Sequence, residues 1–303
     1  MSVQITTAFV QQYKANVYHL TQQKGSKLRQ GVRVESVNGK NAYYDQIGAT
    51  SARKRTSRHA DTPRMDTPHS RRRVALEDYD WADLIDNEDQ VRMLIDPTSQ
   101  YADAAAMAMG RSMDDAIIAA ALATAYTGED GSTSTSYSSA MTVGIQTVWP
   151  GVSAADTGLN VAKLIAASSL LGQNDVDPDE ERYIAVNARQ ITSLLKDEKL
   201  ASHDYNILRP LVDGKVAMYM GFTFLPTNRI TTDSSGDDEV LYWAKGGLLL
   251  GVGSDIQTKI GERADKNYAT QVFTSMSIGA TRMEEVRVGK ILCDPGASPT
   301  TDA

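Results

Sequence analysis

Residues 32–47 read VRVESV, then NG, then KNAYYDQI. Asn38-Gly39 permits positive φ at both central positions of a type I′ turn, whose twist matches that of paired strands, so the pattern predicts a β-hairpin from Val32 to Ile47. Residues 48–70 are rich in Thr, Ser, Arg, His and Pro and show no apolar periodicity. Such a long irregular stretch is unusual inside a compact domain. We therefore expect a projecting loop that contacts something outside its own domain.

The charges of this region are separated into two adjoining blocks. The chain has 303 residues and a formal net charge of −7. Residues 53–73 carry eight basic and only two acidic side chains, whereas residues 77–96 carry eight acidic side chains and one arginine. Opposite charges in adjoining blocks favour the pairing of one copy with another. We expect inter-subunit contacts at Arg53, Lys54, Arg55, Arg71, Arg72, Arg73, Glu77, Asp78, Asp80 and Asp83.

The basic block also has the chemistry to bind phosphates, because guanidinium groups bridge oxyanions well. Against this, the acidic block that follows would repel a polyanion, and no aromatic residue lies among the arginines to stack on bases. On the charge-pairing hypothesis, reversing Arg71, Arg72 and Arg73 to Glu should block the joining of subunits without unfolding them.

Hydrophobic periodicity predicts the remaining elements. Helices are expected over residues 5–20, 97–126, 158–171 and 189–196. Strands are expected over residues 73–76, 183–186, 218–226, 241–253, 268–278 and 286–292. Asp114 and Asp115 interrupt the apolar residues of the longest helix, so their side chains are expected to reach solvent or a basic partner.

Several classes of protein are disfavoured by composition and motif. The composition is that of an ordinary globular protein, with 41% hydrophobic residues. Cys293 is the only cysteine, so neither an internal disulfide nor a cysteine metal cluster is expected. No signal peptide or membrane-spanning stretch is recognisable. Phosphate-binding and serine-nucleophile motifs are absent, and the four histidines are scattered.

The acidic string Asp175-Val-Asp-Pro-Asp-Glu-Glu181 leaves one enzymatic alternative open. Clustered carboxylates suit hard cations, although the glycine and closing glutamate of a calcium loop are missing. A solvated acidic turn is the simpler interpretation. The alternative is a soluble metal-dependent hydrolase.

Three stretches resemble a known family: ITTAFVQQYKANVYHLTQQKGSKLR at 5–29, RYIAVNARQITSLL at 182–195, and the region from Gly214 through Gly221 to Asn228. They are similar to the major capsid protein of tailed bacteriophages, which has the Hong Kong ninety-seven type fold. The resemblance implies an α+β fold with an N-arm at 1–31, an extended β-hairpin loop at 32–80 and an axial domain at 139–261. A peripheral domain with a long spine helix would comprise 81–138 and 262–294, followed by a C-terminal tail at 295–303.

The resemblance implies a structural protein and not an enzyme. It would assemble with itself into pentamers and hexamers of an icosahedral shell enclosing double-stranded DNA, without cofactor, metal or membrane. Portal, scaffolding and decoration proteins would be its other partners. It would be located in the virion after assembly in the host cytoplasm. A protein nanocompartment that encloses an enzyme is the alternative within the same fold.

Overall fold

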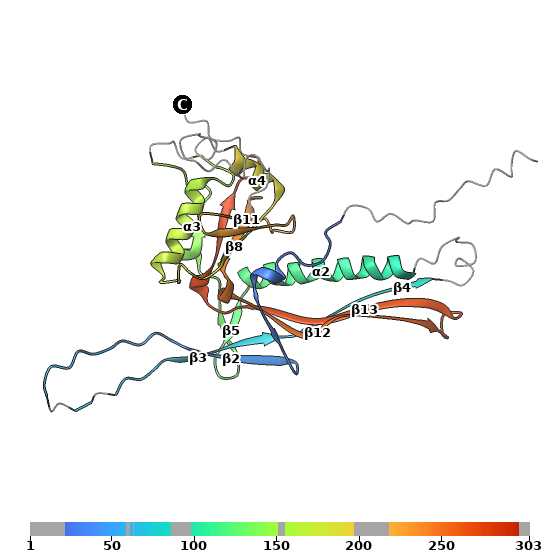
Figure 1. The fold of residues 1–303 in the computed structure, drawn as a ribbon, viewed down its shortest axis with the longest axis horizontal. Helices are drawn as coiled ribbons and strands as arrows, with labels where there is room; N and C mark the ends of the chain where they lie inside the picture. Colours follow the sequence, from blue (N-terminus) through green and yellow to red (C-terminus); the bar gives the residue numbers. More distant parts are fainter. Residues whose placement is uncertain are drawn as a thin grey trace, which may run out of the picture. The chain divides into compact units, whose positions relative to one another are not determined.

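The computed structural model describes residues 22–58, 61–62, 64–85, 98–150, 155–196 and 218–296. The helix expected over residues 5–20 lies outside these ranges. The chain divides into two compact units. We call residues 27–77, 112–253 and 278–303 the core unit, and residues 1–26, 78–111 and 254–277 the long-strand unit. The elements are labelled in Figure 1.

The core unit is built on a six-stranded sheet with strand order β7-β14-β11-β8-β10-β9. Its members are β7 (Thr142–Val143), β8 (Arg182–Val186), β9 (Met218–Tyr219), β10 (Phe222–Pro226), β11 (Asp238–Ala244) and β14 (Val288–Cys293). Every residue of β8 and β11 is buried, as expected for central strands covered on both faces. The predicted strands at 183–186 and 286–292 are therefore confirmed. The single strand predicted over residues 241–253 is wrong, because a 3₁₀ turn at Lys245–Gly247 separates β11 from a strand that begins at Leu248 and belongs to another sheet.

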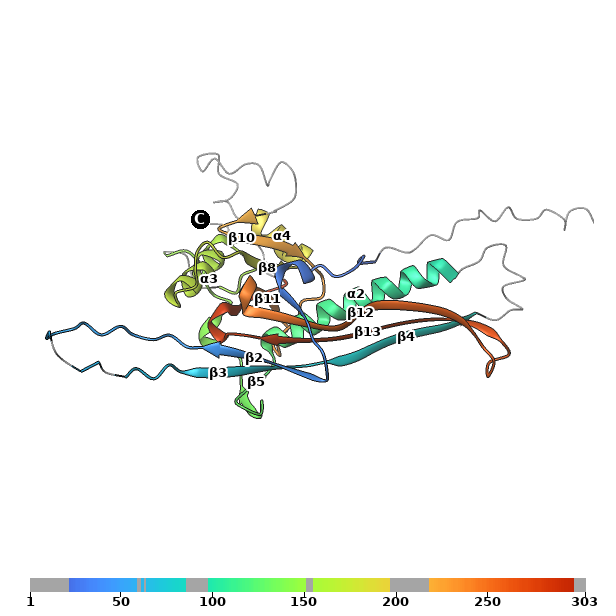
Figure 2. The ribbon, with the colours of Figure 1, turned by 60° about the horizontal axis from the view of Figure 1, so that its bottom comes forward.

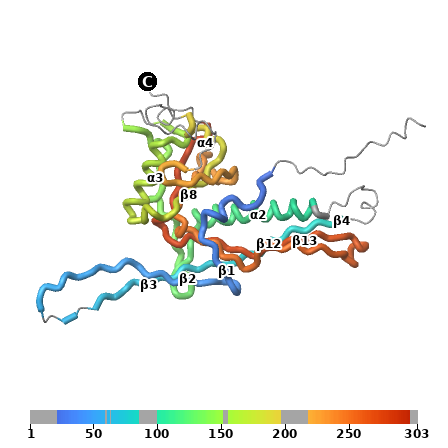
Figure 3. The backbone as a smooth tube through the Cα atoms, viewed as in Figure 1, coloured from blue at the N-terminus to red at the C-terminus, as the bar shows by residue number. Residues whose placement is uncertain are grey.

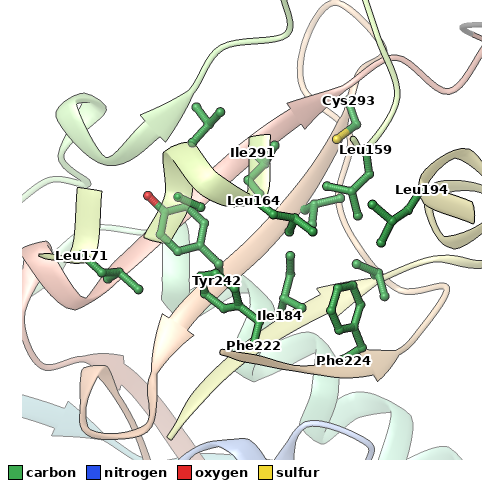
Figure 4. Close-up of a cluster of buried hydrophobic side chains, with 14 of the residues drawn as sticks. Leu159, Leu164, Leu171, Ile184, Leu194, Phe222, Phe224, Tyr242, Ile291 and Cys293 are labelled. Atoms are coloured by element: carbon green, nitrogen blue, oxygen red, sulfur yellow. The ribbon is translucent and has the colours of Figure 1, made fainter. Parts of the chain in front are cut away.

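Helices α3 (Val161–Gln173) and α4 (Ala188–Leu195) complete this unit and confirm two predicted helices. Each begins at an asparagine whose side chain accepts a hydrogen bond from a backbone N–H of the first turn. Asn160 accepts from Lys163 N and Asn187 from Gln190 N, both at 2.8 Å. Apolar side chains of α3 pack with those of the sheet in one core cluster, shown in Figure 4.

Lys163 is fully buried at the start of α3. Its Nζ donates to the carbonyl oxygens of Thr157 at 2.7 Å and Leu292 at 2.8 Å. Burial lowers the pKa of Lys163 below its ordinary value.

We therefore expect Lys163 to make stability depend on alkaline pH. Below the ordinary lysine pKa of 10.5, the folded chain releases this proton while the unfolded chain retains it, so the free energy of unfolding rises with pH in that window. Urea titrations between neutral pH and that value should show this rise, and Lys163→Met should lack it. If the free energy of unfolding rises equally with pH in the wild type and in Lys163→Met, Lys163 is not the group responsible.

A four-stranded sheet with order β2-β3-β5-β6 also belongs to the core unit. Its strands are β2 (Asn41–Ile47), β3 (His69–Ala75), β5 (Ala125–Thr127) and β6 (Thr133–Thr135). The antiparallel pairing of β2 and β3 joins Asn41 to Ala75 and Ile47 to His69. Residues 48–68 connect them, and Figure 3 shows this connection extending far from the sheet. The irregular composition of residues 48–70 therefore corresponds to a long connection between two paired strands.

The hairpin predicted over Val32–Ile47 is wrong, although both strands exist. β1 (Arg33–Ser36) pairs in parallel with β12 (Leu248–Arg263), and β2 pairs with β3. Val37 N donates to Val252 O at 2.9 Å, which continues the β1 pairing. A side chain on Gly251 would lie 2.8 Å from Val37 Cγ2. This glycine lets β1 approach β12, so the chain crosses between sheets at Asn38-Gly39 instead of folding back.

The single strand predicted over residues 218–226 is also wrong. β9 and β10 are two short antiparallel strands. Met220 and Gly221 between them have φ of 51° and 79°, which form a tight turn. Phe222 and Phe224 point into the core, whereas Met218 is 65% exposed. The alternation of apolar residues therefore arises from two strands and not one.

The predicted long helix is confirmed as α2 (Thr98–Leu122), which contributes to both units. The expectation for Asp115 holds, because it forms an ion pair with Arg229. The expectation for Asp114 is wrong, because its side chain is fully buried and accepts hydrogen bonds from the backbone N–H groups of Lys27 and Leu28, at 3.0–3.1 Å. These backbone donors hold the Asp114 carboxylate inside the fold, away from solvent.

The long-strand unit contains β4 (Glu77–Ile85), the outer parts of β12 and β13 (Ala269–Arg282), and the first half of α2. These strands belong to a sheet with order β1-β12-β13-β4, and Figure 2 shows β4, β12 and β13 following one another closely. Val272, Thr274, Met276 and Ile278 are all buried, which confirms the predicted alternation for this part of the strand. Tyr268, where the alternation was predicted to begin, precedes β13 and is 60% exposed. Within the described ranges, 3₁₀ turns lie at Arg29–Gly31, Ser139–Met141, Lys245–Gly247 and Glu285–Arg287.

Candidate inter-subunit contact site

The basic residues of the projecting loop are exposed. Arg53, Lys54 and Arg55 all face solvent. Arg55 donates to the backbone carbonyls of Ser57 at 2.9 Å and of Arg58, and no acidic side chain in the described part of the chain pairs with it. These three side chains are therefore available to a partner.

Arg71 and Arg73 lie on one face of β3, because alternate strand residues share a face. Arg71 Nε donates to Asp45 Oδ1 at 2.6 Å, and its guanidinium lies 5.8 Å from the centre of the Tyr43 ring. The hydrogen bond lowers the pKa of Asp45 below its ordinary value. Arg73 lies 4.5 Å over the Tyr126 ring of β5. Both side chains are half-buried but remain open to solvent on one side.

Arg72 points to the opposite face of β3 and is buried. Its Nε and Nη2 donate to Met283 O at 3.1 and 2.8 Å, and Nη2 also donates to Glu285 Oε1 at 2.9 Å. A glutamate here would place its carboxylate against another carboxylate and a carbonyl. The triple reversal of Arg71, Arg72 and Arg73 would therefore disturb folding as well as assembly, which overturns the expectation that it leaves the subunit folded.

The four acidic candidates all lie on β4. Glu77, Asp78 and Asp80 are exposed, whereas Asp83 is half-buried and accepts a hydrogen bond from Leu84 N at 2.8 Å. β4 is an edge strand of its sheet. Charged side chains on an edge strand discourage unspecific strand pairing while offering a charged surface to a specific partner. The six basic candidates thus lie in the core unit. Of the four acidic candidates, Glu77 lies in the core unit and the other three lie in the long-strand unit.

Met283 and Glu285 both bind Arg72, and nothing in the sequence around them predicts this contact. They follow the end of β13, more than 200 residues after Arg72. From the sequence, the adjoining residues Glu284 and Glu285 are expected only to point to different faces. In the structure, Glu284 pairs with Arg287 and Glu285 pairs with Arg72.

The carboxylates of the acidic string diverge. Glu180 pairs with Arg287 at 2.9 Å, and Glu181 accepts from Lys245 Nζ at 2.6 Å and from the Tyr183 hydroxyl at 2.8 Å. Within the described ranges, no three His, Cys, Asp or Glu side chains are grouped so as to hold a metal ion. The described residues therefore give the hydrolase alternative no metal centre.

No helix within the described part of the chain is long and apolar enough to cross a membrane.

Comparison with known proteins identifies one family. The phage capsid protein family matches residues 5–295. The structure is similar to the capsid structure of the cyanophage P-SCSP1u, with a TM-score of 0.74 at 17% identity over 96% of this chain and 94% of that one. It also resembles the capsid of Ralstonia phage GP4, with a TM-score of 0.72 at 10% identity over 96% and 97% of the two chains. No curated protein sequence matches. The chain has the α+β fold of these capsid proteins and belongs to the phage capsid protein family.

Proposed function

We propose that this chain is the structural subunit of an icosahedral shell, in which it forms pentamers and hexamers that enclose double-stranded DNA. The observation that carries the proposal is the family match over residues 5–295 together with a fold shared over nearly the full length of phage capsid chains. Its partners would be further copies of itself, with portal, scaffolding and decoration proteins. The shell would assemble in the host cytoplasm and remain in the virion.

The charge distribution supports assembly through the projecting loop. Arg53, Lys54 and Arg55 are exposed on the loop, and Asp78 and Asp80 are exposed on β4. We propose that the loop of one subunit meets the acidic strand of a neighbour. One exposed ion pair contributes about 0–1 kcal/mol, so a single contact is weak and reversible. Repetition over every interface of a shell sets the register and makes assembly sensitive to salt.

Negative-stain microscopy of the purified protein tests the proposal. Rings or closed shells are expected at low salt, and fewer of them at high salt, where exposed charges are screened. If the protein remains monomeric at every salt concentration, with and without its scaffolding protein, the proposal fails. Shells that co-purify with DNA support the proposed contents, whereas a co-purifying enzyme would indicate a nanocompartment.

A further inference from the structure

Asn38-Gly39 is the only Asn-Gly pair in the chain. It lies in the core unit where the chain crosses from β1 to β2, and both residues are exposed. Asparagine is one of the thermolabile side chains of proteins. Its side-chain amide carbon is within reach of the backbone nitrogen of the next residue, and a glycine there leaves that nitrogen unshielded by a side chain. The contact proposed between subunits does not involve this pair.

The crossing lacks the hydrogen bonds that close an Asn-Gly turn. In a type I′ hairpin, the backbone groups of residues 37 and 40 would bond each other. Val37 N donates instead to Val252 O at 2.9 Å, and Lys40 O accepts from Leu76 N at 3.0 Å. In the described part of the chain, no hydrogen bond engages the Asn38 side chain or Gly39 N. Nothing there holds these two groups apart.

The space around Gly39 is open as well. Its φ is 97°, and a Cβ built on it would meet no atom of the described chain within 4 Å. Asp130-Gly131, which could react in the same way through its carboxyl group, is different. Gly131 N donates to Gly128 O at 3.1 Å, and a Cβ on Gly131 would lie 2.8 Å from Arg73 Cδ. The backbone nitrogen is therefore engaged at Gly131 and accessible at Gly39.

We propose that Asn38 is a site of spontaneous covalent modification, with water as the only co-reactant. Gly39 N loses its proton and attacks Asn38 Cγ, so that a bond forms between these atoms. The bond from Cγ to Nδ2 breaks, and the side-chain nitrogen leaves as ammonia. Water then opens the resulting cyclic imide. Attack at Cγ breaks the new bond and gives aspartate, whereas attack at the backbone carbonyl carbon gives isoaspartate. No oxidation or reduction takes place.

Both products place a carboxylate where a neutral amide stood, and isoaspartate also changes the backbone. In isoaspartate the chain runs through Cβ and Cγ of residue 38, which adds one atom between Val37 and Lys40. The hydrogen bonds to Val252 and Leu76 hold both ends of this short span. The added atom must therefore bulge outwards at the base of β2, from which the projecting loop extends. The inference does not depend on the proposed function.

Timed incubation of the folded subunit at mildly alkaline pH, where the attacking nitrogen loses its proton more readily, tests the proposal. Trypsin cuts after Arg33 and Lys40 and so releases residues 34–40 as one peptide. We expect this peptide to accumulate a form heavier by the difference between OH and NH₂, which an isoaspartate-specific methyltransferase labels. A sample digested before incubation corrects for reaction during digestion.

The free peptide of residues 34–40, incubated in parallel, gives the rate without a fold. The folded subunit should react at a comparable rate, because the crossing leaves both reacting groups unbound. If the free peptide reacts and the same residues in the folded subunit stay unmodified, the fold protects Asn38 and the inference is overturned.

Asn38→Gln is the matched control, because it keeps an exposed amide but would have to close a larger ring. Its peptide should lose the heavier form over the same incubation. Equal accumulation in this variant and in the wild type would place the reaction at another residue and overturn the assignment. The peptide that contains Asp130-Gly131 should stay free of isoaspartate. Labelling of both peptides at the same rate would show that the contacts of Gly39 and Gly131 do not control reactivity, which also overturns the inference.

Discussion

Replacing Gly289 by alanine is expected to lower the free energy of unfolding by about 3 kcal/mol, because no space exists for one added carbon. Gly289 in β14 lies opposite Tyr242 in β11. A Cβ at this position would overlap the ring and hydroxyl of Tyr242 and would lie 2.5 Å from Met141 O. The Tyr242 hydroxyl donates to that same carbonyl at 2.8 Å, so the ring cannot move aside without breaking a buried hydrogen bond.

Urea unfolding of the isolated subunit measures this loss. Gly172→Ala is the matched control, because Gly172 lies in α3 with no atom within 4 Å of an added Cβ. Alanine favours the helix by about 1 kcal/mol relative to glycine, so this control should be slightly more stable than the wild type. Two variants with the same stability would contradict the packing described around Tyr242.

Reversing the three loop cations, with Arg53, Lys54 and Arg55 changed to Glu, is expected to abolish shell formation at about 0.1 M salt. Each attraction would become a repulsion of similar size, and every interface of a shell repeats the change. The melting temperature of the subunit should stay within about 2 °C of the wild type, because exposed substitutions usually change stability by less than 0.5 kcal/mol. Microscopy and sedimentation measure assembly, and calorimetry measures stability.

The control for this variant keeps the charge at the same positions: Arg53→Lys, Lys54→Arg and Arg55→Lys together. It should form shells. A charge-reversed protein that forms normal shells would show that the loop cations do not set the contact. Reversing Arg53, Lys54 and Arg55 tests assembly without disturbing folding. Reversing Arg71 to Arg73 would affect both, because Arg72 is buried.

The sequence predicted most of the local elements, because each depends on nearby residues. The apolar spacing of residues 97–126 predicts α2, although the helix ends at Leu122 and Ala125–Thr127 forms β5; the alternation in residues 268–278 predicts β13. Irregular composition and clustered charge predicted the projecting loop. These signals are short-range, so they are readable without knowing what each element packs against.

Strand partners were less predictable, because pairing is decided by distant residues. Asn38-Gly39 favours a local hairpin, yet β1 pairs with β12, more than 200 residues away, where Gly251 leaves room for it. Met218 to Phe224 alternate like one strand, yet the positive φ of Met220 and Gly221 divides them into two. In both cases the local pattern fits two structures. Long-range packing selects one for β1, whereas a tight turn between adjacent residues selects one for β9 and β10.

The sequence by itself determined the secondary elements, the separated charge blocks and the resemblance to phage capsid proteins. Only the tertiary structure decided which charges are exposed. Three consecutive arginines read alike in the sequence, but the pleat of β3 sends Arg71 and Arg73 to one face and Arg72 to the other. Met283 and Glu285 bind Arg72 because folding brings the end of β13 to the root of the loop. Whether a charge contacts a neighbour or its own chain is a property of that packing.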